Sequence, residues 1–507
     1  MHHNWFSRLS FVILGGALLY LYQFMLRSQS AIFLESFGIW GSLALFGLIL
    51  AMVLGLFLVF RGLRRKNFHI SAKAELWIAL TILAAGFVVR LVYILHMPLE
   101  PASDFLRYQT VAQHLADGTL QTAGSSYCDY LALYPGTIGT SVYLSLLYRL
   151  FGADNLLAAQ TANVILAMTS CFFVWRAARR ICGIGAGLAA LFLTTFFPSQ
   201  ILFSNGLASE FPFVFLMTLC VWLFTILVDS LKQQRICTSV LLTLCIGVLA
   251  SINQSVRSTS GILLVAAVIC LLSMRPFQFH PNTFKKLLCP ILAVVMIVSF
   301  ILTGSICTSA IAKAIDREPA KGVKKAGWNL FLGMNRESVG KYNLDDVAFW
   351  NEVMEGKTPA EAHAICFDAA IERAFEDVGS LPKLLIGKYE ILWGDDGYAC
   401  DYNMIHKGDQ GTLTPATKEF LHVSRIVCSV FYFLMLVLSG VYVVFAWKQR
   451  YLDSGYFLVL IWLGTIAAHL VLEVAPRYHY HVLSLMPIIA AIALKHLWNA
   501  ENSTPVA

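Results

Sequence analysis

The chain has 507 residues, of which 58% are hydrophobic and only 13% are charged. A soluble protein carries charge on about a quarter of its residues, so this composition excludes a soluble globular protein and a protein with one membrane anchor. The net charge is +7, but the chain has no Lys/Arg-rich arm. Basic cytoplasmic loops explain that charge better than nucleic-acid binding does, and we expect no nucleic-acid partner. The composition therefore predicts an all-α polytopic protein whose solvent is the lipid bilayer.

Apolar stretches recur along the chain, and a helix that crosses a bilayer needs about 20 apolar residues. About twelve spans are expected by this criterion, at 9–26, 38–60, 76–95, 155–178, 183–203, 207–228, 236–254, 258–274, 288–310, 422–447, 455–473 and 478–497. The first is expected to be a retained helix and not a cleaved signal peptide. The twelve cysteines show no zinc-type spacing, and a disulfide between Cys128 and Cys400 is left open.

Positive charge orients these spans. The loop at 61–66 is strongly basic and is expected to be cytoplasmic, so the third span leads outward and places 96–131 outside. The short apolar stretch 137–151 would move the later arginine cluster around Arg179 outside if it crossed the membrane. We therefore expect it to lie along the membrane surface, with both termini cytoplasmic.

Four regions follow from this topology. Residues 1–75 hold two extra N-terminal spans and a basic loop, and 76–310 form a transmembrane core with a catalytic outer loop at 96–154. Residues 311–421 form a small extracytoplasmic cap segment, and 422–507 hold the C-terminal spans. Within the cap segment, helices are expected over 359–377 and 381–392. The first has a good N-terminal signal in Thr358, Pro359 and Glu361.

The outer segment 96–118 opens the catalytic loop with a short amphipathic helix, expected to begin at Ser103-Asp104 and to end at Gly118. Its apolar residues recur at helical spacing: Phe105, Tyr108, Ala112 and Leu115. Asp104 thus stands where a membrane exit meets a helix start. One interpretation is a helix N-cap, and another is a general base, because a carboxylate can take a proton from an attacking hydroxyl.

Two arginines are expected at outer turns, where positive charge is under-represented. Arg257 lies between the seventh and eighth spans with few neighbouring charges, and it either binds phosphate or snorkels to lipid headgroups. Arg477 lies in the last outer turn, where it either binds a ligand or forms an internal ion pair with Glu473. Arg90, inside the third span, could reach the outer surface by snorkelling, and the sequence assigns it no role.

Other polar residues receive weaker assignments. Glu210 starts the sixth span, where the helix dipole favours an acid. His479 and His481 alternate in a short turn and leave a divalent metal open, although no established metal spacing occurs. Several acids are expected to be solvated in loops: Asp129, Asp345, Asp346, Asp395 and Asp396.

An outer carboxylate, outer arginines and an extracytoplasmic cap segment suit one chemistry. The carboxylate can act as a base, and the two arginines can neutralise a phosphate leaving group. The pattern therefore predicts group transfer from a lipid-linked phosphate.

The sequence also resembles integral-membrane glycosyltransferases of the C superfamily (GT-C), in particular the dolichyl-phosphate-mannose protein mannosyltransferase-like and aminoarabinose-transferase-like branches. Five motifs carry the resemblance, in order, over most of the chain from residue 76 on: Ser103-Asp104-Phe105 with Tyr108, Ala112 and Gly118; Tyr134-Pro135-Gly136 leading to Arg149-Leu150-Phe151-Gly152; Phe197-Pro198 with Ser209-Glu210; Gly327-Trp328-Asn329 to Gly333-Met334-Asn335; and Pro476-Arg477-Tyr478 with Met486-Pro487. The family often has Asp-Glu where this chain has Asp104-Phe105.

The resemblance implies a GT-C fold with surface helices in the first outer loop. It implies that Asp104 is the general base and that Arg257 and Arg477 hold the phosphate of a polyprenyl-phosphate sugar. Supporting roles are expected for further residues near these motifs: Tyr108, Glu210, Glu473, Tyr478 and His479. The sugar would pass, with inversion, to a glycan, protein or lipid acceptor outside a bacterial plasma membrane.

Two other functions remain open on sequence. A transporter or flippase of a lipid-linked sugar would grip phosphate with the same arginines and would need no base; broken helices and charges near the bilayer midplane would favour it. A surface-polysaccharide polymerase or ligase would share the donor and differ in the acceptor.

Overall fold

The computed structural model describes residues 5–28, 38–39, 47, 70–152, 155–273, 283–449 and 453–500. Throughout these ranges the regular elements are helices and no strand occurs, which confirms the all-α class. Among the described residues, seven helices are long and apolar enough to cross a membrane: Trp5–Ser28, α2 (Ala72–His96), α6 (Leu156–Cys182), α9 (Glu210–Lys232), α10 (Ile236–Gln254), α12 (Thr283–Ile315) and α18 (Pro415–Lys448).

Further apolar helices complete the bundle. One span is broken, with η5 (Pro476–His479) and α20 (Tyr480–Leu483) bent by 49° from α21 (Met486–Ala500). Three segments are apolar but shorter: α7 (Ile184–Thr195), η2 with α11 (Ser258–Ser273) and α19 (Gly455–Val471). Each expected span coincides with one of these helices except 38–60, which lies largely outside the described residues. The chain is a multi-pass membrane protein.

Burial separates the centre of the bundle from its rim. Two thirds of the most apolar part of α9 and of α18 is buried inside the protein, against 28% for α2 and 33% for α12. The exposed side chains of the two rim helices are themselves apolar, for example Leu80, Val88 and Leu302. An apolar face of this kind is stable against lipid and not against water.

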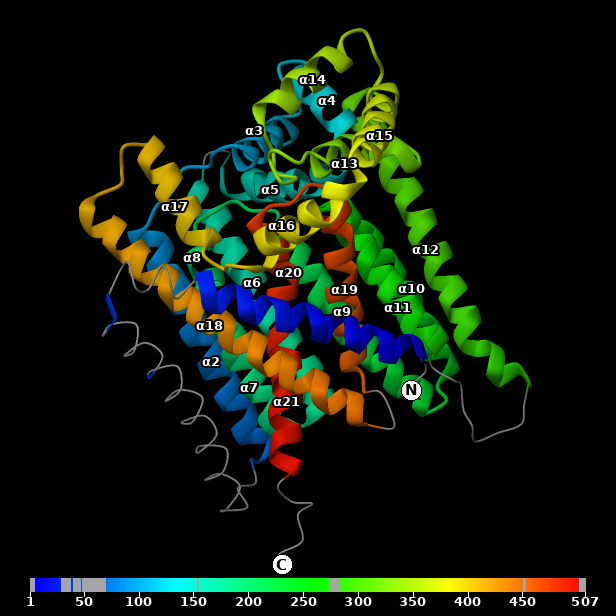
Figure 1. Ribbon diagram of the computed structural model, residues 1–507. Coiled ribbons are helices and arrows are strands. Elements are labelled where there is room, and N and C mark those ends of the chain that lie inside the picture. The colour runs from blue at the N-terminus through cyan, green and yellow to red at the C-terminus, as the bar shows by residue number, and fades with distance from the viewer. Residues whose placement is uncertain are drawn as a thin grey trace, which may run out of the picture.

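The segment after α2, expected as the first outer loop, forms short helices at one end of the bundle, as expected (Figure 1). They are α3 (Asp104–Asp117), α4 (Ser125–Leu133) and, after the short turn η1 (Pro135–Thr137), α5 (Ile138–Phe151). The apolar stripe of α3 is buried, and Gly118 ends this helix with φ +70°. The Gly139 N–H donates to Ser255 O at 2.8 Å, and a Cβ at Gly139 would lie 2.7 Å from that oxygen. Glycine there lets α5 lie against the end of α10.

The segment 311–421 adds short helices at the same end of the bundle (Figure 1). After η3 (Val323–Ala326) they are α13 (Gly327–Gly333), α14 (Leu344–Met354), α15 (Pro359–Glu376), η4 (Val378–Ser380), α16 (Leu381–Trp393) and α17 (Tyr398–Asp409). The expected helices over 359–377 and 381–392 are confirmed, and α15 begins with a complete capping box between Thr358 and Glu361. Both cysteines considered for a disulfide, Cys128 and Cys400, are buried free thiols.

The N-terminal helix Trp5–Ser28 runs antiparallel to α18 across the bundle (Figure 1). The Tyr22 hydroxyl donates to Leu436 O at 2.6 Å, while Gly15 faces Val443 further along α18. The Tyr389 hydroxyl of α16 donates to Ala17 O at 2.9 Å. This helix therefore braces α16 and α18 from outside.

Polar contacts tie the spans together at two levels. At the end of α6 remote from the outer loop, Arg179 pairs with Glu75 at 2.5 Å and Arg180 with Asp229 at 2.7 Å. Arg90, which the sequence left without a role, does not snorkel: its side chain is buried and donates to Thr195 O of α7 at 2.7 Å. Interior packing of α2 against α6 and α7 gives its guanidinium a carbonyl partner in place of water.

Candidate active site

Asp104 is the first residue of α3, and Ser103 occupies the N-cap position with an uncommon φ of +53°. Asp104 Oδ2 accepts a hydrogen bond from Arg477 at 3.0 Å, and Asp104 Oδ1 lies 3.8 Å from the guanidinium of Arg107, one turn along α3. The carboxylate thus faces two guanidinium groups. Strained backbone at a helix start is typical of functional sites, and here it delivers the acid to Arg477.

Arg477 reaches Asp104 from the last outer turn, 373 residues away in sequence. It follows Pro476 in η5, and its guanidinium lies 5.6 Å from the ring centroid of Phe105 and 5.8 Å from that of Tyr478. The described contacts of Arg477 pair it with Asp104, whereas the expected alternative was an ion pair with Glu473. The last turn and the first outer loop therefore meet at this guanidinium.

Arg257 completes the same cluster. It donates to Glu210 Oε1 at 2.7 Å and to Ser209 Oγ at 2.9 Å, and it lies 5.5 Å from the Tyr478 ring centroid. The expectation of few neighbouring charges is wrong, because Glu210 opens α9 beside the end of α10. The ring of Tyr478 thus lies within cation–π reach of both arginines.

Tyr108 and Glu473 lie within electrostatic reach of this cluster. Burial raises the pKa of Tyr108, the Asp104 carboxylate adds to that rise, and Arg257 and Arg477 oppose it. Burial likewise raises the pKa of Glu473 to about 7, with Arg477 and a hydrogen bond from Tyr478 acting in the opposite direction. Glu473 is therefore a second carboxyl group beside Asp104, poised between its two protonation states near neutral pH.

Backbone contacts dock the loop of Glu473 onto the cap segment. The Glu473 N–H donates to Asn329 O at 2.8 Å, and the Val474 N–H donates to Gly340 O at 2.9 Å. Lys388 of α16 supports the same place from behind, since its buried ammonium donates to Gly333 O at 2.7 Å. Burial lowers the pKa of Lys388 to about 7, and the nearby Glu473 opposes that effect.

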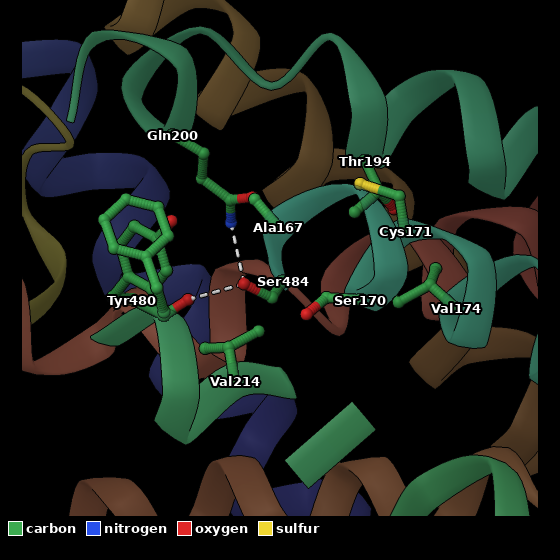
Figure 2. Close-up of a pocket in the computed structure, with 10 residues that line it drawn as sticks. Ala167, Ser170, Cys171, Val174, Thr194, Gln200, Val214, Tyr480 and Ser484 are labelled. Atoms are coloured by element: carbon green, nitrogen blue, oxygen red, sulfur yellow. Dashed lines mark hydrogen bonds between the residues drawn. The ribbon is translucent and has the colours of Figure 1, made fainter. Parts of the chain in front are cut away.

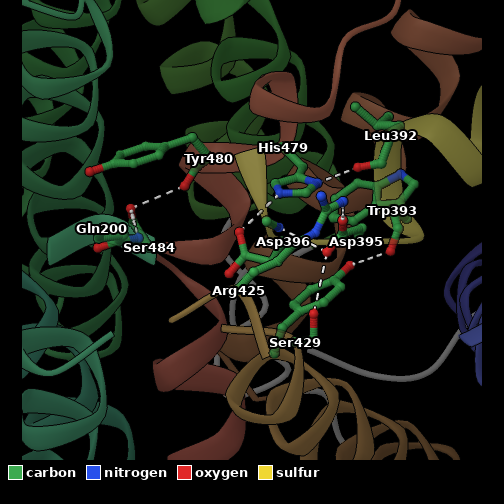
Figure 3. A network of polar contacts seen from close by, with 12 residues as sticks. Gln200, Leu392, Trp393, Asp395, Asp396, Arg425, Ser429, His479, Tyr480 and Ser484 are labelled. Atoms are coloured by element: carbon green, nitrogen blue, oxygen red, sulfur yellow. Dashed lines mark hydrogen bonds and ion pairs between the residues drawn. The ribbon is translucent and has the colours of Figure 1, made fainter. Parts of the chain in front are cut away.

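His479 lies apart from these residues, in a network shown in Figure 3. Its Nε2 is 3.4 Å from Asp396 Oδ1, and its Nδ1 contacts the Leu392 carbonyl. His481 instead bonds the Thr465 hydroxyl at 2.8 Å. The two histidines face different partners, and no group of three or more metal-ligating side chains occurs in the part of the chain that the structure describes.

Two of the acids expected to be solvated are buried, so that expectation is wrong for them. Asp346 is 3% exposed and pairs with Arg373 at 3.0 Å, while Asp396 is fully buried. Asp396 is the polar residue that sequence reasoning missed. A signal was present, since Asp395-Asp396 lies between two glycines that are themselves flanked by Trp393 and Tyr398, and aromatic neighbours indicate a packed loop.

A small pocket with mainly apolar walls lies among α6, α7, α8 (Pro198–Leu202), α9 and α20 (Figure 2). Gln200 donates to the Ser484 hydroxyl at 2.8 Å, which in turn donates to Tyr480 O at 3.1 Å. Other polar lining residues are Ser170, Cys171 and Thr194. The pocket is lined by neutral groups and is distinct from the charged cluster.

The charged cluster can support group transfer. Asp104 offers a carboxylate that can accept a proton, and Arg257 and Arg477 offer guanidinium groups that can bind phosphate oxygens. Their convergence from α3, the end of α10 and η5 places acid and cations side by side at one end of the bundle.

No protein-family model matches the chain, and no curated protein matches it. Among solved structures, it is similar to the oligosaccharyltransferase of Archaeoglobus fulgidus in complex with Zn and sulfate, at 11% identity and a TM-score of 0.47, over 83% of this chain and 49% of that one. It is also similar to ArnT from Cupriavidus metallidurans, at 13% identity and a TM-score of 0.34 for the apo state, over 84% and 78% of the two chains.

The same ArnT bound to undecaprenyl phosphate matches at 12% identity and a TM-score of 0.33, over 83% and 78% of the two chains. Both proteins are GT-C glycosyltransferases, the superfamily whose motifs the sequence resembles. The chain spans about half the length of the archaeal protein.

Proposed function

We propose that the protein is a GT-C-type membrane glycosyltransferase that moves a hexose-type sugar from a polyprenyl-phosphate donor to an acceptor hydroxyl. The observation that carries this proposal is the 3.0 Å contact between Asp104 and Arg477, with Arg257 beside the same Tyr478 ring. A base and two phosphate ligands are the groups that such a transfer needs. Their positions at the outer turns support an active site on the extracytoplasmic face.

In the proposed reaction Asp104 takes the proton of the acceptor hydroxyl, and the acceptor oxygen bonds the anomeric carbon. The bond from that carbon to the phosphate oxygen breaks, and the electron pair leaves with the lipid phosphate. Arg257 and Arg477 neutralise the charge that develops there. Because Arg477 bonds one oxygen of Asp104, a donor phosphate would compete for this guanidinium. A single displacement inverts the anomeric configuration.

The rest of the assignment is proposed with it. The protein would lie in a bacterial plasma membrane with both termini cytoplasmic, which fits the arginine-rich end of α6 opposite the site. Residues 76–310 would form the core with the loop 96–154, after the N-terminal region 1–75. Residues 311–421 would form the cap segment that meets a glycan, protein or lipid acceptor, and 422–507 would supply Arg477.

The decisive experiment measures release of polyprenyl phosphate from labelled polyprenyl-phosphate hexoses by purified protein. Asp104→Asn should lower the rate by about 10²–10⁴-fold, the usual contribution of a general base, and should retain donor binding. Asp117→Asn, an exposed acid at the far end of α3, is the matched control and should behave as wild type. Equal rates for wild type and Asp104→Asn would reject Asp104 as the base.

A lipid-linked sugar transporter is the second candidate, and two observations favour it. The last span is broken with a bend of 49°, and Arg90 is buried inside the bundle. Broken helices and buried charge are features of transporters. Movement of the labelled donor between vesicle leaflets without release of polyprenyl phosphate would support transport. A polymerase or ligase of surface polysaccharide would release the phosphate and would require a glycan acceptor.

A further inference from the structure

The turn η5 (Pro476–His479) is too short to hold its own position. It has four residues, and one backbone hydrogen bond, from Tyr478 N–H to Ala475 O at 3.0 Å, joins it to the residue before it. Short 3₁₀ turns have poor hydrogen-bond geometry. The side chains of the turn therefore add to the backbone contacts that fix the position of Arg477.

Each side chain after Pro476 holds a different part of the protein. Arg477 reaches Asp104 on α3, and the ring of Tyr478 lies 5.0 Å from that of His469 on α19. His479 points the other way, into the interior, and is fully buried. Its ring stacks on Trp393 with centroids 5.5 Å apart and on Tyr432 with centroids 5.8 Å apart.

Polar contacts fix the orientation of the His479 ring. Its Nδ1 contacts the carbonyl of Leu392, which can only accept, so Nδ1 carries a proton. Its Nε2 lies 3.4 Å from Asp396 Oδ1 (Figure 3). This contact is electrostatic, because within the described residues neither Nε2 nor Oδ1 has a hydrogen-bond partner.

Burial of the Asp396 carboxyl group at this position is energetically unfavourable. It is fully buried, and within the described residues neither of its oxygens accepts a hydrogen bond of normal geometry. Burying a charge without full hydrogen bonding is unfavourable. The polar groups that favour its charged form are His479 and the Ser199 hydroxyl, and the neighbouring Asp395 opposes them.

The neighbouring Asp395 already anchors the loop that carries Asp396. It pairs with Arg425 of α18 at 2.5 Å, accepts from Ser429 at 3.3 Å and accepts from the Gly397 N–H at 2.8 Å. The loop therefore does not need Asp396 to stay on α18. What Asp396 adds is its contact with the turn of Arg477.

We propose that Asp396 is a positioning residue that acts through His479 to hold η5 where Arg477 binds the phosphate of the polyprenyl donor. The inference rests on the proposed function, in which Arg477 is a phosphate ligand. It assigns no bond making or breaking to Asp396.

A double-mutant cycle on binding of polyprenyl phosphate tests this role. Asp396→Asn should weaken binding roughly tenfold, the size of coupling found between residues of one network. In an Arg477→Gln background the same substitution should have no further effect, because the group it positions is gone. His479→Asn keeps a donor for the Leu392 carbonyl and loses the contact with Asp396, so it must reproduce the pattern and serves if Asp396→Asn does not fold.

Asp395→Asn is the matched control, because it loosens the same loop from α18. It should lower the unfolding temperature, and its effect on binding should be the same with and without Arg477. An equal effect of Asp396→Asn in both backgrounds would mean a general structural role and would overturn the inference.

The cycle also separates the inference from the proposed function. If polyprenyl phosphate binds with the expected coupling but no donor is turned over, the enzyme assignment fails and the positioning role stands. If wild-type protein does not bind polyprenyl phosphate, both are overturned.

Discussion

The carboxylate of Glu210 and the guanidinium of Arg257 lie 2.7 Å apart, and 2% of the Glu210 side chain is exposed. A buried ion pair is weak evidence for stability, but loss of one partner leaves an uncompensated charge and costs about 3–5 kcal/mol. A single substitution of Arg257 therefore changes stability and phosphate binding together. Two substitutions are needed to separate them.

We expect Arg257→Gln to lower the unfolding temperature, because Glu210 then remains buried without its cation. Glu210→Gln combined with Arg257→Gln should restore most of the stability but not the binding of polyprenyl phosphate. Thermal unfolding and binding measured on the same detergent-purified samples give both quantities. Recovery of binding in the double variant would show that Arg257 serves the fold alone.

Asp396 gives a prediction about pH. Burial raises its pKa from 3.8 to about 6, an effect that His479 and Ser199 reduce and Asp395 increases. A carboxyl group whose pKa is higher in the folded protein stabilises the fold below the unfolded pKa, and this contribution is lost as the pH rises through about 6. A shift of about two units corresponds to about 3 kcal/mol.

Asp396→Asn should therefore unfold at a higher temperature than wild type at pH 8, and this advantage should disappear near pH 4. Unfolding temperatures at the two pH values measure it, with Asp395→Asn as the neighbour that pairs with Arg425. An Asp396→Asn variant less stable than wild type at pH 8 would show that the buried carboxylate stabilises the folded protein.

At the scale of elements, the N-terminal helix and α18 meet at Gly440. A Cβ at this position would lie 2.3 Å from the Tyr22 hydroxyl oxygen, so the close approach depends on glycine. Tyr22 uses that hydroxyl to bond Leu436 O. The contact therefore joins a packing constraint and a hydrogen bond in one place.

Gly440→Ala should destabilise the protein by about 1–3 kcal/mol, the usual effect of overpacking. Tyr22→Phe removes the clashing oxygen, so Gly440→Ala should cost much less in that background. Gly16→Ala, on the N-terminal helix with open space around it, should be neutral or slightly stabilising. Thermal unfolding of the four variants and wild type measures these costs. Equal effects of Gly440→Ala in both backgrounds would show that the Tyr22 hydroxyl is not the group that limits the space at Gly440.

At the scale of the whole molecule, the cap segment is joined to the last outer loop through Gly333. A Cβ there would lie 2.2 Å from Val471 O, which is backbone and cannot rotate away. Gly333→Ala should therefore displace the loop that leads to Arg477. We expect it to reduce the rate of donor turnover while leaving the unfolding temperature little changed. Gly408→Ala on α17, with nothing near its Cβ, is the control. Normal turnover by Gly333→Ala would show that this contact of the cap segment does not position the site.

The bundle and its surface helices could be predicted from the sequence because their signals are local. Hydropathy marked the spans, and the capping box at Thr358 marked α15. Charge counting predicts that 137–151 lies on the surface, and the structure has there the helix α5 (Ile138–Phe151), which is absent from the candidate spans.

The partners of the charged residues could not be predicted, because they depend on which outer turns meet. Arg477 and Asp104 were each noticed, but their contact joins the two ends of the fold. Asp396 was expected in water and is buried, because burial of a short loop is decided by the helices around it. The hydrogen bond from Arg90 to an interior carbonyl likewise depends on the helices packed around it.

The ion pairs at the far end of α6 have a consequence for biogenesis. Basic residues orient a chain during insertion, whereas acids contribute little to that choice. Arg179 and Arg180 would thus first help select the orientation of α6, and only later bind Glu75 of α2 and Asp229 of α9. In the proposed orientation the same two side chains would serve insertion first and assembly later. A chain without Glu75 would insert in the native orientation, and its defect would appear later, when α2 and α6 associate.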